Sequence, residues 1–343
     1  LSDRFGRTGV QQDLEEAIDV YRQAVKATPP GHPNLAGYLN NLGTGLSDRF
    51  GRTGVQQDLE EAIGSYRRAC DLGLHSAPEE TLRAGRNWQR WAFQRESWEE
   101  VLEAYSFVEK EMERRLSQQF SRADRSFSLG GVQGLAAQAS YAHLKLGQPG
   151  QAVEALEAGR ALLMREALER QRRDLHLLEE LGYGDLYQDF MEASERYDAL
   201  LAQAGSEMRP ADWIQQVKGA SEKMQSAAES IRTSAGAKHP QYRFFLKPLP
   251  LQEIQGQAQD APLVYLAATS LGGMALIANA TSIKEINLPE LDDAALRKIL
   301  VGADEKVLGG YMGAYNVWRN GDSNAFALWS NALDETAHWL WDA

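Results

Sequence analysis

The chain has 343 residues, which is enough for two domains at about 150 residues each. Hydrophobic residues make up 43% and charged residues 24%, a globular composition that argues against wholesale disorder. The net charge of −12 excludes a general nucleic-acid binder, because phosphate neutralisation needs an excess of cations. A single cysteine excludes both a disulfide framework within the chain and a cysteine-based zinc cluster.

The most apolar stretch runs from Pro262 to Ala280 and is interrupted by Thr269, Ser270 and two glycines. It is also shorter than the ~20 apolar residues that a membrane-spanning helix needs, and a strand hairpin explains it better. The first residues lack the basic-then-apolar pattern of a secretory leader. We therefore expect a soluble cytoplasmic protein without a membrane partner.

The first third of the chain contains an internal repeat. The segment Leu1–Ile18 recurs letter for letter as Leu46–Ile63, 45 residues later. A period of this size is typical of a stacked helical array. A third copy of the second half begins at Ser97, at an offset of 39, and a weaker fourth copy begins at Gly147.

Each unit is predicted to hold two helices. Apolar residues at three- and four-residue spacing form one stripe in each of them, as the buried face of an amphipathic helix requires. The first stripe consists of Leu39, Leu42, Leu46 and Phe50, and the second of Leu59, Ala62, Ile63, Tyr66 and Ala69. Two prolines, Pro29 and Pro30, end the helix of the preceding unit.

These residues resemble the tetratricopeptide repeat (TPR). Its consensus places are filled by Ala17, Tyr21, Ala24 and Pro29 in one unit, and by Leu39, Leu42, Gly43, Leu46, Ala62, Tyr66 and Ala69 in the next. The loop between the helices is about seven residues longer than the usual ~34-residue unit allows, which resembles the kinesin-light-chain-like variety. The resemblance covers residues 1–161 in about four units and implies a superhelix whose groove binds a peptide.

Four side chains are the candidate peptide-binding residues of this groove. The repeat alignment predicts that Asn40 and Thr44 face inward from one unit, and that Arg86 and Arg90 do so from the next if Trp88 fills its core place. An Asn amide can hold a peptide backbone, and an arginine can bind a carboxylate bidentately, so we expect an acidic peptide or protein partner. The alternative is that Arg86 and Arg90 neutralise neighbouring acids on a solvated helix.

A helical connector is predicted over residues 162–240. A long helix can run from Gln151 to about Leu181, and two amphipathic stretches follow at residues 186–204 and 211–233. The small polar run from Ser234 to His239 ends at a helix-breaking proline, Pro240, and predicts a domain boundary there.

Strand signals follow that boundary. Short apolar runs at 263–267 and 274–278 flank a glycine turn, and residues 283–288 alternate with period two as a half-exposed strand does. A short helix is expected at 293–300, and a last helix after Asp322, with Phe326, Trp329, Leu333 and Leu340 on one face. The predicted fold is mainly α: a repeat superhelix, a helical connector and a small α/β region.

The region 241–343 resembles the amino-terminal half of the CHAT domain, a caspase-like module associated with TPRs. The similarity lies in Ala261–Leu266, the hairpin through Gly272–Ile277, Ile286–Pro289 and the closing run Trp339–Ala343. It implies a parent cysteine peptidase and an incomplete caspase-like sheet. The family carries its histidine and cysteine in later strands, in motifs that this sequence lacks.

The residues themselves support no catalytic, metal or cofactor site. The one cysteine, Cys70, aligns with Val25 of the preceding unit, so a small core residue explains it better than a dyad with His75. The tryptophans Trp88, Trp91 and Trp98 are expected to fill the array rather than to stack on a ligand. We expect no hydrolysis by this chain alone; a non-catalytic scaffold or adaptor is the rival function, and an enzyme of small molecules comes third.

Both ends of the sequence lie within predicted helices. Leu1 begins partway through a repeat helix and Ala343 stops within an amphipathic helix, so we expect a piece of a longer protein. An incomplete sheet would expose the apolar surface around 263–266 and 276–277. The expected covers are the last helix with Trp339 and Trp341, the connector helices, or a second chain that completes the sheet.

Overall fold

The computed structural model describes residues 11–119, 134–163, 175–203, 210, 212–302, 309–320 and 326–342. Over these residues the chain is mainly helical, with one small antiparallel sheet in its last third. The predicted fold class, mainly α with a small α/β region, is confirmed. The first ten residues, which open the first repeat copy, lie outside the described part.

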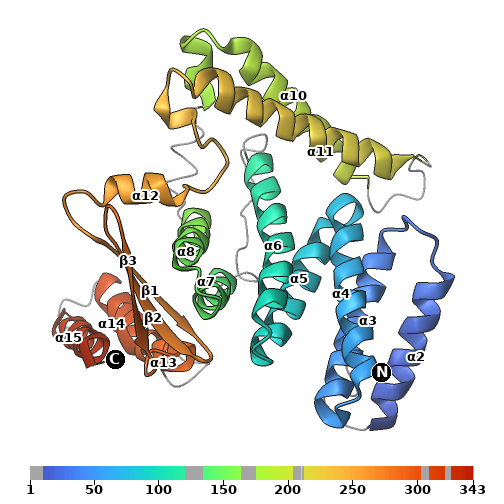
Figure 1. Cartoon of the computed structure of the whole chain (residues 1–343), viewed down its shortest axis with the longest axis horizontal. Helices are drawn as coiled ribbons and strands as arrows, with labels where there is room; N and C mark the ends of the chain where they lie inside the picture. Colours follow the sequence, from blue (N-terminus) through green and yellow to red (C-terminus); the bar gives the residue numbers. More distant parts are fainter. Residues whose placement is uncertain are drawn as a thin grey trace. The chain divides into compact units, whose positions relative to one another are not determined.

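The chain forms two compact units, whose helices and strands are labelled in Figure 1. Unit 1 comprises residues up to Leu135 together with Ala158–Pro248, and unit 2 comprises Ala136–Glu157 together with Leu249–Ala343. These divisions differ from the boundaries predicted at residues 161 and 240. The fourth repeat-like helix pair belongs mostly with the sheet, and the second boundary falls eight residues later.

In unit 1 the repeats fold as successive helices that pack side by side in chain order (Figure 1). Their bounds are α2 Gln11–Ala27, α3 Asn34–Thr53, α4 Gln56–Ser76, α5 Pro78–Gln94 and α6 Trp98–Gln119. The predicted stripe residues Leu39, Leu42 and Leu46 are buried, as is Tyr66 of α4. Helix α3 ends at Gly54, whose φ of 68° is the left-handed conformation that glycine tolerates at a helix end.

Two further helices of unit 1 are α10 (Gly184–Leu201) and α11 (Trp213–Ser230), which pack against each other and agree with the two predicted amphipathic stretches. The segment after α11 continues as the short π-helix η1 (Ile231–Ala235) and the 3-10 helix η2 (Pro240–Tyr242). Tyr242 and Phe245 are buried in the core of these helices, and Phe245 meets Phe190 edge to face. That packing moves the boundary beyond the predicted Pro240. Residues 164–174 of the predicted long helix lie outside the described residues.

Unit 2 is built on the strands β1 (Leu263–Thr269), β2 (Gly272–Ala278) and β3 (Ile283–Leu288), paired antiparallel in that order. All three predicted strands are confirmed. Gly272 opens β2 with a φ of 107°, which a side chain would strain. The helices of this unit are α7 (Leu135–Lys145, mostly here), α8 (Pro149–Leu163, shared with unit 1), α12 (Leu251–Gln257), α13 (Asp293–Val301), α14 (Gly310–Arg319) and α15 (Phe326–Asp342).

One face of the sheet packs on α8. Leu276 of β2 is fully buried with Ala152 and Val153 of α8. The Tyr265 hydroxyl donates a 3.0 Å hydrogen bond to Glu157 Oε2 of α8, and the Leu251 amide donates a 2.8 Å bond to Glu154. Helix α8, which the sequence assigns to the repeats, thus covers the predicted apolar surface at 276.

No helix in the described part of the chain is long and apolar enough to cross a membrane. The last helix, α15, was predicted to cover apolar strand surface with Trp339 and Trp341. The side chain of Trp341 lies outside the described residues. Phe326 and Leu333, two of the four residues predicted to share its apolar face, are exposed.

Candidate functional site

The array is joined where a glycine of each first helix meets a second helix. A side chain at Gly43 of α3 would lie 2.9 Å from the Tyr66 ring of α4, and one at Gly85 of α5 would lie 2.8 Å from Val108 of α6. These equivalent contacts align the third unit at an offset of 42 rather than the 39 read from the sequence. By this alignment Arg86 takes the place of Thr44.

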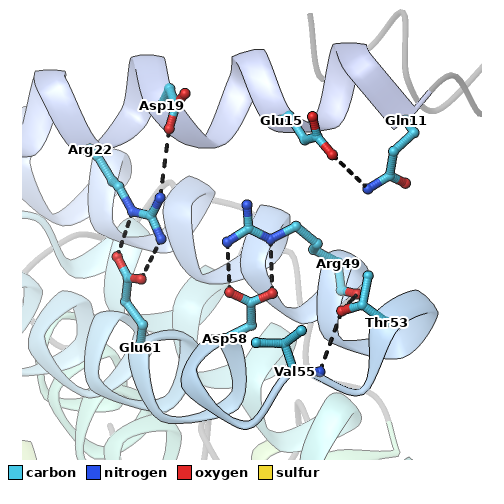
Figure 2. Close-up of polar contacts among 9 residues, drawn as sticks. All are labelled: Gln11, Glu15, Asp19, Arg22, Arg49, Thr53, Val55, Asp58 and Glu61. Carbon is cyan, nitrogen blue, oxygen red and sulfur yellow. Dashed lines mark hydrogen bonds and ion pairs between the residues drawn. The ribbon is translucent and has the colours of Figure 1, made fainter.

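Arginine–carboxylate pairs join neighbouring helices of the array (Figure 2). Arg22 of α2 binds Glu61 of α4 bidentately at 2.8 and 2.5 Å, and Arg49 of α3 binds Asp58 of α4 at 2.8 and 2.6 Å. The hydrogen bonds to these carboxylates raise the pKa of both guanidinium groups. The arginines in these pairs therefore stabilise the packing of the array.

The same pairing recurs one unit further on. Arg67 of α4 binds Glu103 of α6 at 2.5 and 2.8 Å, and Glu61 and Glu103 are related by the offset of 42. Arg95 binds Glu100, which also accepts a 2.6 Å bond from Trp88 Nε1. A ladder of ion pairs thus follows the repeats.

Two of the predicted peptide-binding residues are engaged inside the array. The side chain of Asn40 is only 2% exposed, and its Oδ1 accepts a 3.1 Å hydrogen bond from Asn87 Nδ2 of α5. The Thr44 hydroxyl donates to the Asn40 carbonyl at 3.0 Å and accepts from the Tyr66 hydroxyl at 3.2 Å. In this structure, Asn40 fixes α3 against α5, and Thr44 fixes α3 against α4.

The other two predicted residues, Arg86 and Arg90, lie one turn apart on α5. Arg90 is exposed and Arg86 half-buried, and the Trp88 between them is fully buried, as the prediction required. Neither guanidinium forms an ion pair with a described carboxylate, and the buried Nε of Arg86 has no hydrogen-bond partner there. Partial desolvation of its guanidinium by the surrounding protein, followed by the charge of Arg86, lowers the pKa of Arg90. The structure therefore places Arg86 and Arg90 one helical turn apart. Asn40, in contrast, is buried in a contact between helices and is not available to a ligand.

We refer to Arg86 and Arg90 as the arginine pair. Two like charges at i and i+4 on a helix destabilise it by about 0.2–0.5 kcal/mol, and here no described acid offsets that cost. A guanidinium keeps its charge at neutral pH and presents N–H groups in a planar fork that matches a carboxylate. The pair is thus a cationic site in a chain of net charge −12.

Sequence reasoning missed one neighbour of these residues, Asn87, and one repeat equivalent, Asp48. Asn87, one residue after Arg86, makes the bond to Asn40, and a comparison of polar residues in adjacent first helices could have suggested it. Asp48 of α3 aligns with Arg90 at the offset of 42. Burial raises the pKa of Asp48 despite the opposing charge of Arg52. The equivalence of Asp48 and Arg90 becomes visible only with the offset of 42 that the structure gives.

The described residues hold no thiol–imidazole site. Cys70 is fully buried, and burial raises the pKa of its thiol, so little thiolate forms at neutral pH. The side chain of His75 lies outside the described residues. Within the described ranges, no group of three or more His, Cys, Asp or Glu residues could hold a metal ion.

The three tryptophans fill space within the array. Trp88 packs near Phe107, Trp91 meets Phe50 edge to face, and Trp98 meets Phe93. The Arg95 guanidinium lies 3.9 Å from the Trp91 ring centre. Their contacts therefore agree with the predicted structural role.

No family model, curated protein or solved structure matches the chain.

Proposed function

We propose that the helical array of unit 1 recognises an acidic peptide or protein segment through the arginine pair. The observation that carries this proposal is a contrast within one set of helices. Arg22, Arg49, Arg67 and Arg95 each bind a carboxylate of the array, whereas Arg86 and Arg90 bind none among the described residues. A carboxylate ligand would neutralise the charge of the pair through the N–H groups of the guanidinium forks.

Asn40 and Thr44 belong to this proposal as residues that position the site. Asn40 links α3 to α5 through Asn87, which directly follows Arg86. Loss of that link would let α5 shift against α3 and would change the direction of the arginine pair. The ligand itself binds the guanidinium groups.

The proposal is tested with fluorescent decapeptides that carry glutamates at varied spacing, each matched to a peptide with glutamine in place of glutamate. We expect binding of some glutamate peptides, weakened by salt, and loss of binding in the double variant Arg86→Glu/Arg90→Glu. Equal binding of the glutamine peptides, or retained binding by the double variant, contradicts the proposal.

The control variant makes the same charge reversal at an arginine outside the arginine pair. Arg68 of α4 is exposed like Arg90, so Arg68→Glu alters the net charge as much as Arg90→Glu does. We expect Arg68→Glu to bind the peptides as the unmodified chain does, and Arg90→Glu to bind them more weakly. An equal loss in both variants would indicate a general charge effect.

The wider proposal is that this chain is the interaction part of a TPR–CHAT protein of the cytoplasm. Helical repeats followed by three antiparallel strands and short helices support it, and the parent would be a caspase-like cysteine peptidase. The rival proposal is a scaffold whose α/β region only docks a partner. The burial of the chain's one cysteine favours no catalysis by this chain itself.

A thiol-directed peptidase probe tests the catalytic assignment. We expect no labelling of the folded chain and no peptide cleavage, with Cys70→Ala behaving identically. Labelling at Cys70 together with cleavage that the variant loses would make this chain the peptidase. Peptide cleavage that survives Cys70→Ala would instead contradict the cysteine-peptidase class.

A further inference from the structure

The two edges of the sheet differ in charge. The β3 edge carries Lys284 and Glu285, both exposed, and such charges discourage pairing with another strand. The β1 edge, Leu263–Thr269, has no charged residue. The structure therefore protects one edge of the sheet and leaves the other open to a further strand.

Exposed apolar side chains follow the uncharged edge. Val264 is 57% exposed and Leu266 is 55% exposed, and both lie on the face of the sheet opposite Tyr265. Ile277 of β2 pairs with Val264 and Ile286 of β3 lies in the row of Leu266, so an apolar surface continues inward from the edge.

The backbone of β1 has unused hydrogen-bonding capacity on that side. In an antiparallel pair, alternate residues direct their N–H and C=O groups away from the partner strand. Counted from the Thr269–Gly272 pair at the turn, the outward residues are Val264, Leu266 and Ala268. A parallel bridge between Thr269 and Asp292 occupies the far end of the edge, which leaves Val264 and Leu266.

Two copies of this edge are complementary to each other in one register. If Tyr265 of one copy lies opposite Tyr265 of the other in an antiparallel pair, Val264 of each copy faces Leu266 of the other. This register uses the outward N–H and C=O groups of both residues and sets their exposed side chains against each other. Within Leu263–Thr269 no side chain of either copy carries a charge that would oppose this contact.

We propose that β1 is a self-association edge, through which two copies of this chain pair antiparallel about a twofold axis at Tyr265. The pairing joins the two small sheets into one continuous sheet and buries Val264 and Leu266 of both copies. Because the charged β3 edge ends the sheet on each outer side, the assembly closes as a dimer and does not extend into a fibre. The proposal is independent of the arginine pair.

The test is the molar mass of the full chain in a dilution series, measured by sedimentation equilibrium. We expect a monomer–dimer equilibrium. Leu266→Lys should raise the dimer Kd by about a hundredfold or more, because each substitution acts twice in a symmetric dimer. Circular dichroism of the variant checks that the fold is intact.

Two further variants keep the result decisive. Val264→Pro removes an outward-directed N–H and an exposed apolar side chain without removing a donor to β2, and should also dissociate the dimer. Val20→Lys, at a helical position 51% exposed in unit 1, is the matched control and should leave the Kd unchanged. A monomer at every concentration overturns the proposal. A dimer that survives both Leu266→Lys and Val264→Pro also overturns it. The same holds if Leu328→Lys, at an exposed leucine of α15, dissociates the dimer as strongly as Leu266→Lys does.

Discussion

The repeat array of α2–α6 and the sheet unit handle apolar surface differently. In the described part of α2–α6, only Val20 and Val55 are large hydrophobic residues left exposed. Over the described residues from 249 onward the exposed ones are Leu249, Val264, Leu266, Leu271, Met312, Val317, Phe326, Leu328 and Leu333. The array buries its apolar faces between its own helices, whereas unit 2 exposes apolar surface to solvent.

The difference follows from how each region is built. In the array, every helix has a neighbour from the same repeated pattern, and glycines such as Gly43 and Gly85 let the helices approach closely. In unit 2, α8 covers one face of a three-stranded sheet, and β1 remains at an edge. Repetition supplies each inner element with a partner, and a short sheet does not.

The largest expected effect compares core and edge leucines. Leu42→Ala should lower the free energy of unfolding by about 2–5 kcal/mol, because Leu42 is buried among Leu14, Leu46 and Trp91. Leu266→Ala should change it by less than about 0.5 kcal/mol in the monomer. Denaturant unfolding followed by tryptophan fluorescence measures both, and equal effects would contradict the contrast between the two regions.

A second comparison uses the ion-pair ladder. Asp58→Ala should cost about 3 kcal/mol, because it leaves the partly buried Arg49 without its carboxylate. Glu103→Ala removes a more exposed pair with Arg67 and should cost about 0–1 kcal/mol. Thermal unfolding at low salt ranks the two variants. A larger loss for Glu103→Ala would refute the idea that burial decides the strength of the ladder.

A smaller effect is expected where α8 meets the sheet. Tyr265→Phe removes the hydrogen bond to Glu157 and keeps the ring, so the unfolding free energy should fall by about 1–2 kcal/mol. Tyr311→Phe on α14 is the matched control and should have little effect. Hydrogen exchange of β1 amides would show the change locally. Unchanged exchange in Tyr265→Phe would mean that this bond does not hold the sheet to α8.

The smallest expected effect depends on pH. Burial lowers the pKa of His143 on α7, although the Gln148 hydrogen bond and Glu154 oppose it. The folded state therefore favours the neutral ring, and its stabilising contribution is complete above the unfolded pKa of about 6.5 and is lost as the pH falls through the lower folded value. His143→Gln should show a shallower loss of Tm below that pH than the unmodified chain. Parallel curves would exclude a role for His143.

The repeated helices and the three strands could be predicted because their cause is local. Leucine spacing in α3 and period-two alternation in β3 report which face is buried, whatever lies opposite. The position of α8 could not be predicted, because its apolar residues fit a repeat partner and a sheet equally well. The contacts that place α8 on the sheet come from residues far along the chain: the bonds from Tyr265 and Leu251, and the packing of Leu276.

The candidate site was predicted only in part for a similar reason. Arg86 and Arg90 follow from helix periodicity once Trp88 is placed in the core. The burial of Asn40 depends on Asn87 in another helix, and no periodicity within α3 encodes that contact. Hydrogen bonds between polar side chains of different helices therefore could not be predicted from the sequence.

The ladder also bears on how this array can change in length. The acceptor Glu61 lies within the run Leu46–Ile63, and its counterpart Glu16 lies in the identical run Leu1–Ile18. The donors Arg22 and Arg67 occupy matching positions just after each run. A duplication or deletion of one whole unit would therefore bring an arginine and a glutamate together at the new junction. Unequal recombination between the two runs could change the number of units without a compensating mutation at the joint.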